Sequence, residues 1–344
     1  MNIVFTICSN NYLAQAKVLL NSVIMHNPEY KVVIVLVDRF NAEVKYNLFE
    51  PIVVIKVEEM GIEGFELMVE KYDIVELNTA VKPTSFKYLS DKYRNCEHII
   101  YLDPDIKVFS SLALFNNLLN EYSILLTPHI YTPLAIDTLS PNEQTFQMHG
   151  IYNLGFLALN VKKQQALSLL DWWEERCLSI CFRDTSRGLF VDQLWLNLAP
   201  LYFPETHILR HIGCNMAPWN LHERKLSKFN EEWIVNNSER LIFYHFSSYD
   251  FNKPENINKP FYNRHDFENR PDLKEIYTSY HKELIENDVK FYSTLNCMLY
   301  KPKNQDLIDD NKKINQVTHI LKRLTPPILF DFLSQIKQKI YAKI

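Results

Sequence analysis

Apolar residues along the chain follow two different spacings. Short apolar runs, typical of strands buried on both faces, alternate with longer stretches in which apolar residues recur every three or four positions, as on one face of a helix. The runs that predict strands are 3–7, 32–37, 52–57, 98–102, 124–126 and 156–161, and the stretches that predict helices are 12–26, 78–93, 111–119 and 162–177. This alternation predicts an α/β fold with a mostly parallel sheet flanked by helices.

Two common phosphate-binding loops of α/β proteins are missing from the sequence. The chain has only 6 glycines, which form neither G-x-G-x-x-G nor G-x-x-x-x-G-K-[ST]. An ordinary dinucleotide fold and a P-loop are therefore disfavoured. In an open parallel sheet, ligands gather at the carboxyl ends of the strands, so the site is expected at that edge.

The sequence changes character near residue 261, where charged, tyrosine-rich helical patterns begin at 273–284 and 289–300. A last helical pattern carries lysines on its polar side and apolar residues on one face: Leu329, Leu333, Ile336, Ile340 and Ile344. We expect a catalytic domain over 1–260 and a helical extension over 261–344 that ends in a basic amphipathic tail. Such a tail fits an anionic membrane surface, but docking on the protein itself or on a second copy in a homodimer is slightly favoured.

Composition restricts the partners and the compartment. The formal charge is -4 in 344 residues, so no strong field favours nucleic acid, and none is expected as a partner. The 6 cysteines lack the close paired spacing of structural zinc sites and are expected to be thiols in a reducing compartment. The opening MNIVFTIC lacks a basic region, and its apolar stretch is too short for a signal or membrane helix. A cytoplasmic location is expected, and the tail leaves peripheral contact with the inner membrane face open.

A pair of carboxylates directly follows the apolar run 98–102. Asp103 and Asp105 flank Pro104. In an extended backbone, residues i and i+2 point to the same side, so the two carboxylates can converge on one cation at the end of the strand. Mg²⁺ or Mn²⁺ held by one or two carboxylates commonly completes its coordination with substrate phosphates. A D-x-D triplet alone is also common in solvated turns, so the interpretation depends on other segments.

The segment Tyr101-Leu102-Asp103-Pro104-Asp105 resembles the Y-L-D-x-D motif of GT-A glycosyltransferases. More narrowly, it resembles glycosyltransferase family 8, which includes glycogenin and bacterial lipopolysaccharide galactosyltransferases. The resemblance extends over roughly 1–254. It implies a Rossmann-like GT-A fold and metal-dependent transfer of a sugar, with retention, from a nucleotide-diphosphate donor, expected to be a UDP-sugar. The implied acceptor is a glycan, a lipid-linked acceptor or a protein, in a setting such as bacterial polysaccharide synthesis.

The resemblance also assigns residues to the donor. Thr6, Cys8 and Tyr12 match the opening strand and turn that flank the base and ribose. Lys87, on the helix before the D-x-D strand, matches a basic residue that contacts the donor phosphates, and Lys82 competes for this role. For Tyr12 a core position, and for Lys87 a solvated helix position, remain open.

Two further segments resemble the part of the family that holds the sugar. Asn153 and Gly155 match an N-x-G turn, in which the amide contacts sugar hydroxyls and the glycine permits close approach. Asp192 and Gln193 match the start of a D-Q-D-x-L-N helix, where the aspartate binds the sugar and the glutamine lies near the anomeric carbon. Leu194 departs from this pattern, which puts the donor identity in doubt.

The strand 241–246 ends in His245 and resembles the H-x-x-G-x-x-K-P-W element. The resemblance makes His245 the third metal ligand beside Asp103 and Asp105, and Lys253 a contact of the diphosphate. Ser248 replaces the motif glycine and Glu255 the tryptophan, which weakens the assignment of Lys253. Two alternatives stay open: a D-x-D phosphatase of the haloacid dehalogenase type, and a catalytically silent protein that binds a sugar nucleotide or glycan.

Overall fold

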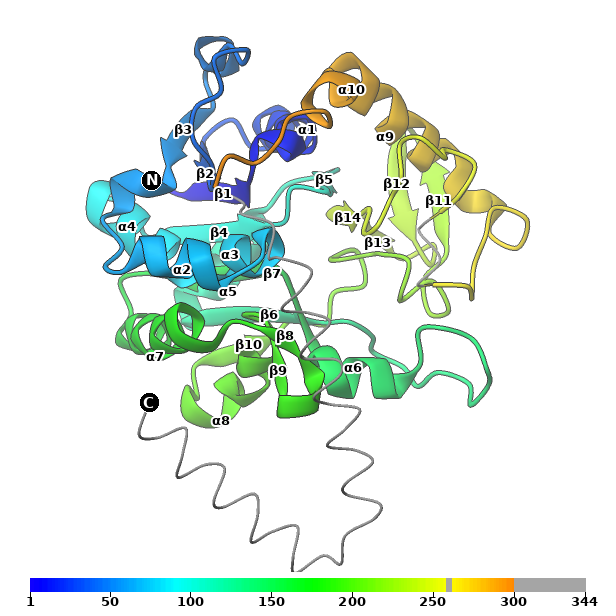
Figure 1. The fold of residues 1–344 in the computed structure, drawn as a ribbon. Coiled ribbons are helices and arrows are strands. Elements are labelled where there is room, and N and C mark those ends of the chain that lie inside the picture. Colours follow the sequence, from blue (N-terminus) through cyan, green and yellow to red (C-terminus); the bar gives the residue numbers. More distant parts are fainter. Residues whose placement is uncertain (258–261, 300–344) are drawn as a thin grey trace, which may run out of the picture. The chain divides into compact units, whose positions relative to one another are not determined.

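The computed structural model describes residues 1–257 and 262–299, and Met1–Tyr300 form one compact unit. Its centre is a seven-stranded sheet in the order β10-β6-β7-β4-β1-β2-β3 (Figure 1). The strands are β1 (Ile3–Cys8), β2 (Lys31–Leu36), β3 (Val53–Lys56), β4 (His98–Leu102), β6 (Ile124–Pro128), β7 (Tyr152–Asn160) and β10 (Thr206–Ile208). The expected amphipathic tail lies outside the described residues.

Six strands of this sheet run in one direction and β7 runs in the other. β1 pairs in parallel with β2 and β4, β2 with β3, and β10 with β6, whereas β7 lies antiparallel between β4 and β6. The predicted α/β fold with a mostly parallel sheet is confirmed. Because the carboxyl ends of β1 and β4 lie at the same edge, the loops that follow them meet there.

Helices cover both faces of the sheet because successive strand residues point to opposite sides. Val4 and Ile100 face one hydrophobic cluster, and Phe5 and Ile99 face the other. The first cluster contains α1 (Leu13–His26), α5 (Ala113–Glu121), α9 (Lys274–Glu286) and α10 (Val289–Tyr292). The second contains α2 (Phe65–Lys71), α3 (Ile74–Ala80), α4 (Lys82–Lys92) and α7 (Gln164–Ile180). Each fully buried aliphatic side chain contributes about 1.5–3 kcal/mol.

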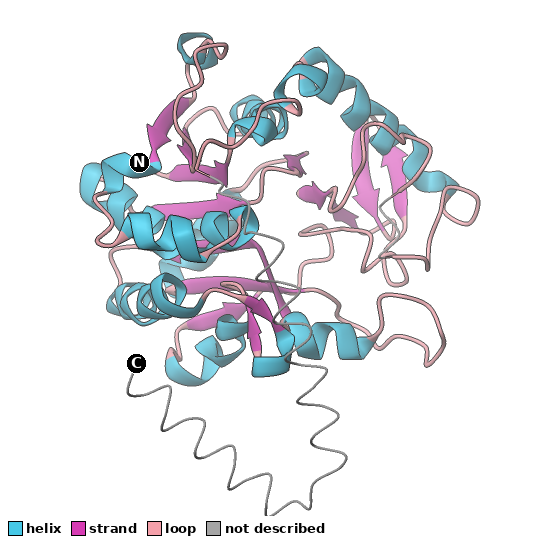
Figure 2. Cartoon of the chain, viewed as in Figure 1, coloured by secondary structure: helices cyan, strands magenta, loops and turns pink. Residues whose placement is uncertain are grey.

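Smaller elements lie beyond the carboxyl edge of β1 and β4 (Figure 2). The strand β5 (Ile106–Val108), which follows β4 after a short turn, pairs antiparallel with β14 (Phe243–His245). A three-stranded sheet is formed by β11 (Leu226–Phe229), β12 (Glu232–Val235) and β13 (Glu239–Arg240). Elsewhere lie the hairpin β8 (Arg183–Asp184) and β9 (Leu189–Phe190), the helices α6 (Glu143–His149) and α8 (Ala199–Tyr202), and several short 3-10 helices.

Element boundaries differ from the predicted ones where backbone chemistry overrides apolar spacing. The single helix predicted over 78–93 is wrong, since α3 ends at Ala80 and α4 begins at Lys82. Pro83 lies in the first turn of α4, where its missing N–H is tolerated, whereas in a continuous helix its ring would collide with the preceding turn. The helix predicted over 289–300 ends at Tyr292.

The helices after residue 261 share a core with the sheet. The rings of Tyr280 and Phe246 stack at 3.8 Å, and Tyr277 packs against Tyr244 and Phe246. These contacts join α9 to the strand that ends in His245. Within the described ranges, none of the helices combines the length and apolar character needed to cross a bilayer.

Candidate functional site

The turn between β4 and β5 is fixed by backbone hydrogen bonds on two sides. The N–H of Asp103 donates to the carbonyl of Gly155 on β7 (2.8 Å), and the N–H of Phe246 donates to the carbonyl of Asp105 (2.9 Å). The N–H of Ile106 donates to the carbonyl of Asp103 (3.0 Å) and closes the turn. These bonds hold both carboxylates at the carboxyl edge of the sheet, next to the end of β14.

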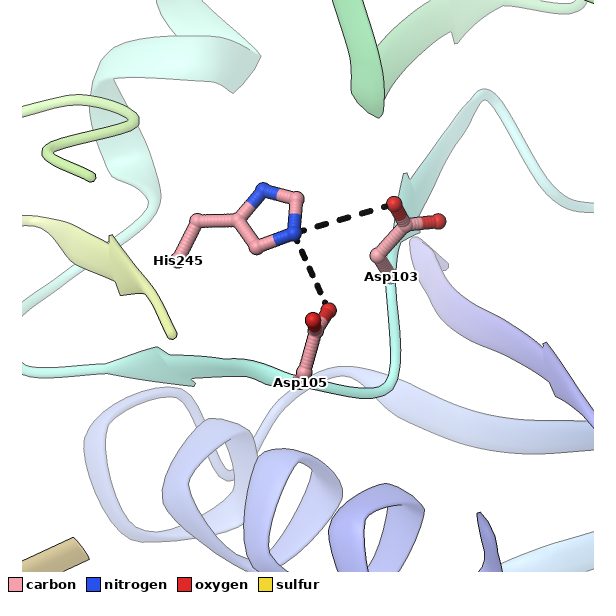
Figure 3. Close-up of side chains that lie close together, drawn as sticks. All are labelled: Asp103, Asp105 and His245. Carbon is pink, nitrogen blue, oxygen red and sulfur yellow. Dashed lines mark ion pairs between the residues drawn. The ribbon is translucent and has the colours of Figure 1, made fainter. Parts of the chain in front are cut away.

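His245 completes a group with Asp103 and Asp105 (Figure 3). Its Nε2 lies 3.0 Å from Asp105 Oδ1 and 3.9 Å from Asp103 Oδ2, and one ligand atom from each residue falls within 4.8 Å of the others. The imidazole is buried, whereas the two carboxylates are 30% and 24% exposed. Two carboxylate oxygens and one imidazole nitrogen, open on one side, fit a hard or borderline divalent ion such as Mn²⁺ or Mg²⁺.

The two carboxylates shift the pKa values of the residues around them. Burial alone would lower the pKa of His245, but Asp105 and Asp103 reverse the shift and raise it. The hydroxyl of Tyr101 donates to Asp103 Oδ1 at 2.5 Å, and burial together with Asp103 raises the pKa of Tyr101 well above its usual value. Tyr101 therefore stays protonated and orients the Asp103 carboxylate.

Gly155 leaves the room that His245 occupies. A Cβ atom on Gly155 would lie 2.5 Å from Cε1 and 2.8 Å from Nδ1 of the imidazole, far inside van der Waals contact. The ring of Trp219 packs edge to face with the imidazole of His245, with a centroid separation of 5.0 Å. The sequence reserved the room at Gly155 for substrate, but the imidazole takes it, and the predicted N-x-G turn lies within β7.

A cavity of about 260 Å³ runs from the two carboxylates past the end of β1 to α3. Cys8 and Tyr12 line it, together with Asn78 and Thr79 of α3. Tyr12 is 44% exposed, and burial with the Asp105 and Asp103 carboxylates raises its pKa to about 12. Thr6 does not line this cavity; it is fully buried within β1.

The turn after β1 depends on a residue that the sequence did not single out. The buried Asp38, just beyond β2, accepts hydrogen bonds at Oδ2 from the backbone N–H of Asn10 (3.2 Å) and from its side-chain amide (2.9 Å). The signal was the placement of a carboxylate directly after an apolar strand, the same pattern that identified Asp103.

The buried cation of the site is Lys82. Its Nζ lies 2.6 Å from Asp192 Oδ2, donates to the carbonyl of Leu154 (3.0 Å) and lies 4.2 Å from the ring centroid of Tyr101. Burial alone would lower the pKa of Lys82, but Asp192 and Asp103 outweigh it and raise the pKa. Lys82 therefore supplies a fixed positive charge beside Asp103.

Lys87, preferred from the sequence, is outside this group. Its Nζ pairs with Asp171 (2.9 Å) and Glu174 (2.6 Å) on α7. Lys82 and Lys87 are five positions apart, which on a helix turns them to different faces. The structure therefore favours Lys82 over Lys87 as the basic residue beside Asp103.

Asn153 and Gln193 already use their amides within the protein. Asn153 Oδ1 accepts from Asn215 Nδ2 (3.1 Å), and its Nδ2 lies 3.4 Å from His129 Nε2. Gln193 accepts from the N–H of Leu154 (3.0 Å) and donates to a carbonyl of α6 (2.8 Å). These contacts brace the start of β7, beside Lys82 and Asp192.

His129 and Asn215 are further residues that sequence reasoning missed. Asn215 adopts φ +56, and its amide also donates to Thr127 Oγ1 (3.1 Å). Burial lowers the pKa of His129 to about 3, so the imidazole is neutral and accepts at Nε2 from Asn153. Asn215 lies in the segment 211–221, which resembles the family's region before the histidine strand, but the proximity of both residues to Asn153 arises only on folding.

Lys253 lies on the loop after β14 and is exposed. Its backbone N–H donates to the carbonyl of Asp250 (2.9 Å), which forms a local turn. Its contact with a diphosphate stays a prediction.

Known proteins similar to this chain include curated sequences and solved structures. The uncharacterized protein YfnD of Bacillus subtilis (strain 168) is 25% identical over 280 residues, which cover 80% of this chain and 86% of YfnD. The galactosyltransferase LgtC, solved with donor and acceptor sugar analogues, is 17% identical, with 82% of this chain and 95% of LgtC covered and a TM-score of 0.45. The glycosyltransferase GlyE of Streptococcus pneumoniae TIGR4 is 16% identical, with 86% and 66% covered and a TM-score of 0.45.

The family assignment depends on the sequence match rather than on these structural likenesses. The model of glycosyl transferase family 8 matches residues 2–178, which is more than half of the chain and includes β1, the turn after it and the Asp103-Pro104-Asp105 segment. The chain therefore belongs to glycosyl transferase family 8 and is a glycosyltransferase of the GT-A fold.

Proposed function

We propose that this glycosyltransferase uses a divalent ion, Mn²⁺ or Mg²⁺, and a UDP-sugar donor, and that it transfers the sugar with retention of anomeric configuration. The observation that carries the proposal is the grouping of Asp103, Asp105 and His245 at the mouth of the cavity beside β1. The bound ion would neutralise a diphosphate and stabilise the charge that develops on it as a leaving group. The proposed acceptor is a glycan, a lipid-linked molecule or a protein, as the family resemblance implies.

The cavity supports the placement of the nucleotide. The side of the cavity away from β7 is lined by Cys8, Tyr12 and α3. A base and ribose bound there would lie next to a diphosphate at the carboxylates. The aromatic face of Tyr12, half exposed at the mouth, is suited to stacking on a base. The diphosphate would then lie at Asp103 and Asp105.

The buried pair of Lys82 and Asp192 supports the placement of the sugar. In the proposed same-face displacement, the bond between the anomeric carbon and the diphosphate oxygen breaks while the acceptor oxygen bonds to that carbon. The acceptor proton passes to the departing diphosphate. Asp192 is held by Lys82 at 2.6 Å, which favours a role in orienting the sugar over one as a nucleophile. Asn153 and Gln193 shape this part of the site through the hydrogen bonds of their side chains.

The first test is a thermal-shift panel of UDP-, GDP-, CMP- and dTDP-sugars, each with Mn²⁺ and with EDTA. A ligand that binds only the native state raises its stability by mass action. We expect a shift with UDP-sugars that requires the metal. A shift with another nucleotide would correct the donor, and no shift with any of them would favour the phosphatase or a silent protein that binds a glycan.

The second test replaces carboxylates by amides. Asp103→Asn and Asp105→Asn should each abolish metal binding and lower kcat/KM by about 1,000-fold, since several kcal/mol of charge stabilisation are lost. Asp171→Asn, on the exposed side of α7, is the matched control and should retain activity. Metal-dependent turnover that survives in both site variants would contradict the proposal. Donor binding without transfer or donor hydrolysis would identify a silent binder.

A further inference from the structure

The imidazole of His245 lacks the hydrogen bond that usually orients a metal-binding histidine. Such a histidine almost always donates its second ring N–H to a carboxylate, a backbone carbonyl or a water. Because Nε2 faces Asp105 and Asp103, the second nitrogen is Nδ1. This atom is buried beyond the reach of solvent and has no hydrogen-bond partner among the described residues. The orientation of the ring therefore depends on packing.

Two neighbours confine the ring of His245. The backbone of β7 approaches the edge that carries Cε1 and Nδ1, since a Cβ atom placed on Gly155 would lie 2.5 Å and 2.8 Å from these atoms. Trp219 contacts the same imidazole with a centroid separation of 5.0 Å and an interplanar angle of 80°. Aromatic rings prefer this edge-to-face arrangement. Both side chains belong to residues that are only 3% exposed, so the contact is closed to water.

Trp219 is itself held on a tied turn. The side-chain amide of Asn220 donates to the carbonyl of Asn215 (2.8 Å) and closes the turn. The same segment anchors the backbone of the histidine, because the N–H of His245 donates to the carbonyl of Met216 (2.8 Å). The segment before β14 thus holds His245 through its main chain and packs an indole ring against its side chain.

We propose that Trp219 is a positioning residue of the metal centre, whose ring holds the His245 imidazole in the orientation that points Nε2 at the ion. In this orientation Nε2 lies 3.0 Å from Asp105 Oδ1, and the three ligand atoms converge. With a smaller side chain at position 219, the imidazole would be free to turn about its side-chain bonds, and Nε2 would leave the carboxylates. This inference rests on the proposed metal-dependent function.

The test is a double-mutant cycle on the Kd for Mn²⁺, measured without donor from the electron paramagnetic resonance signal of the free ion. Trp219→Leu should raise the Kd about 10-fold, at the lower end of the range for groups that orient metal ligands. In a His245→Ala background, where Asp103 and Asp105 hold the ion alone, Trp219→Leu should have no further effect. Trp219→Phe, which keeps an aromatic ring, should show a smaller loss and serves for the same cycle if Trp219→Leu does not fold.

Phe146→Leu is the matched control. Phe146 is buried in the same hydrophobic cluster as Trp219, but its ring stacks on His129 rather than on His245. The Kd should therefore stay unchanged in this variant. A second measurement is the nitrogen coupling of bound Mn²⁺ in electron spin echo envelope modulation, which reports the imidazole ligand and should weaken in Trp219→Leu. It decides the question if the ion binds too weakly in the His245→Ala background.

A loss of affinity in Trp219→Leu that disappears in the His245→Ala background supports the inference, as does a weakened nitrogen coupling. An unchanged Kd in Trp219→Leu, the same loss in both backgrounds, or an equal loss in Phe146→Leu would overturn it. Absence of Mn²⁺ binding in the wild type, or undiminished binding in Asp105→Asn, rejects the metal-dependent function itself.

Discussion

The proposed nucleotide side and the proposed sugar side of the candidate site differ in how their polar groups are used. On the nucleotide side, Asp103 and Asp105 are partly exposed and border an open cavity of about 260 Å³. On the sugar side, Lys82, Asp192 and Asn153 are buried, and each has a partner within the protein. The carboxylates of the first side are open to a ligand, whereas the polar groups of the second side already bind one another.

Because of this difference, we expect one set of residues to determine ligand binding and the other to determine the stability of the fold. Exposed carboxylates keep their hydration until an ion replaces it, so their removal should affect ligand binding more than folding. A buried ion pair has lost its water, so removal of one partner leaves an uncompensated charge. Substitutions on the first side should therefore reduce ligand binding, and substitutions on the second side should reduce the free energy of unfolding.

The largest expected effect comes from breaking the pair of Lys82 and Asp192. Lys82→Met and Asp192→Asn should each lower the free energy of unfolding by about 3–5 kcal/mol, measured by urea denaturation without metal. Replacing both residues together by Met and Leu should recover part of the loss, because no charge is left unpaired. Asp105→Asn is the comparison from the open side and should leave the unfolding free energy nearly unchanged. Equal destabilisation on both sides would remove the distinction.

A smaller effect is expected from the protonation of His129. Its folded pKa of about 3 lies below the ordinary value, so the unfolded state binds the proton more readily and stability falls as the pH drops below the ordinary value. Between pH 7 and pH 4 this group should account for a loss of about 3 kcal/mol. His129→Gln, whose carbonyl oxygen can still accept from Asn153, should flatten the pH dependence of urea unfolding. His265, with a lowered pKa of about 4, keeps its own contribution in both proteins. Identical slopes would contradict the assignment.

The smallest effect is expected at Lys87. Because its ion pairs with Asp171 and Glu174 are near the surface, Lys87→Met should change the unfolding free energy by at most about 1 kcal/mol. It should also leave Mn²⁺ and donor binding unchanged, unlike Lys82→Met. Loss of donor binding in Lys87→Met with an intact fold would restore the role that the sequence suggested for it.

The sequence alone predicted the mostly parallel sheet and the two carboxylates of the site. The run 98–102 coincides with β4 because it is apolar on both faces and is followed by Pro104, and the carboxylates after it were recognisable from i, i+2 spacing. The helix boundary at Pro83 was also present as a signal, but apolar periodicity obscured it.

Tertiary structure decided which polar groups meet. Lys82 and Lys87 lie on the same short helix, and only packing of α4 determined that Lys82 faces Asp192 while Lys87 faces α7. Residues after 261 resembled a separate extension, yet Tyr280 of α9 stacks on Phe246 beside Asp105. Local sequence determines periodicity, turns and the chemistry available at strand ends, because these depend on neighbouring residues. Contacts between residues far apart in the chain depend on how whole elements pack, and a single sequence pattern does not encode them.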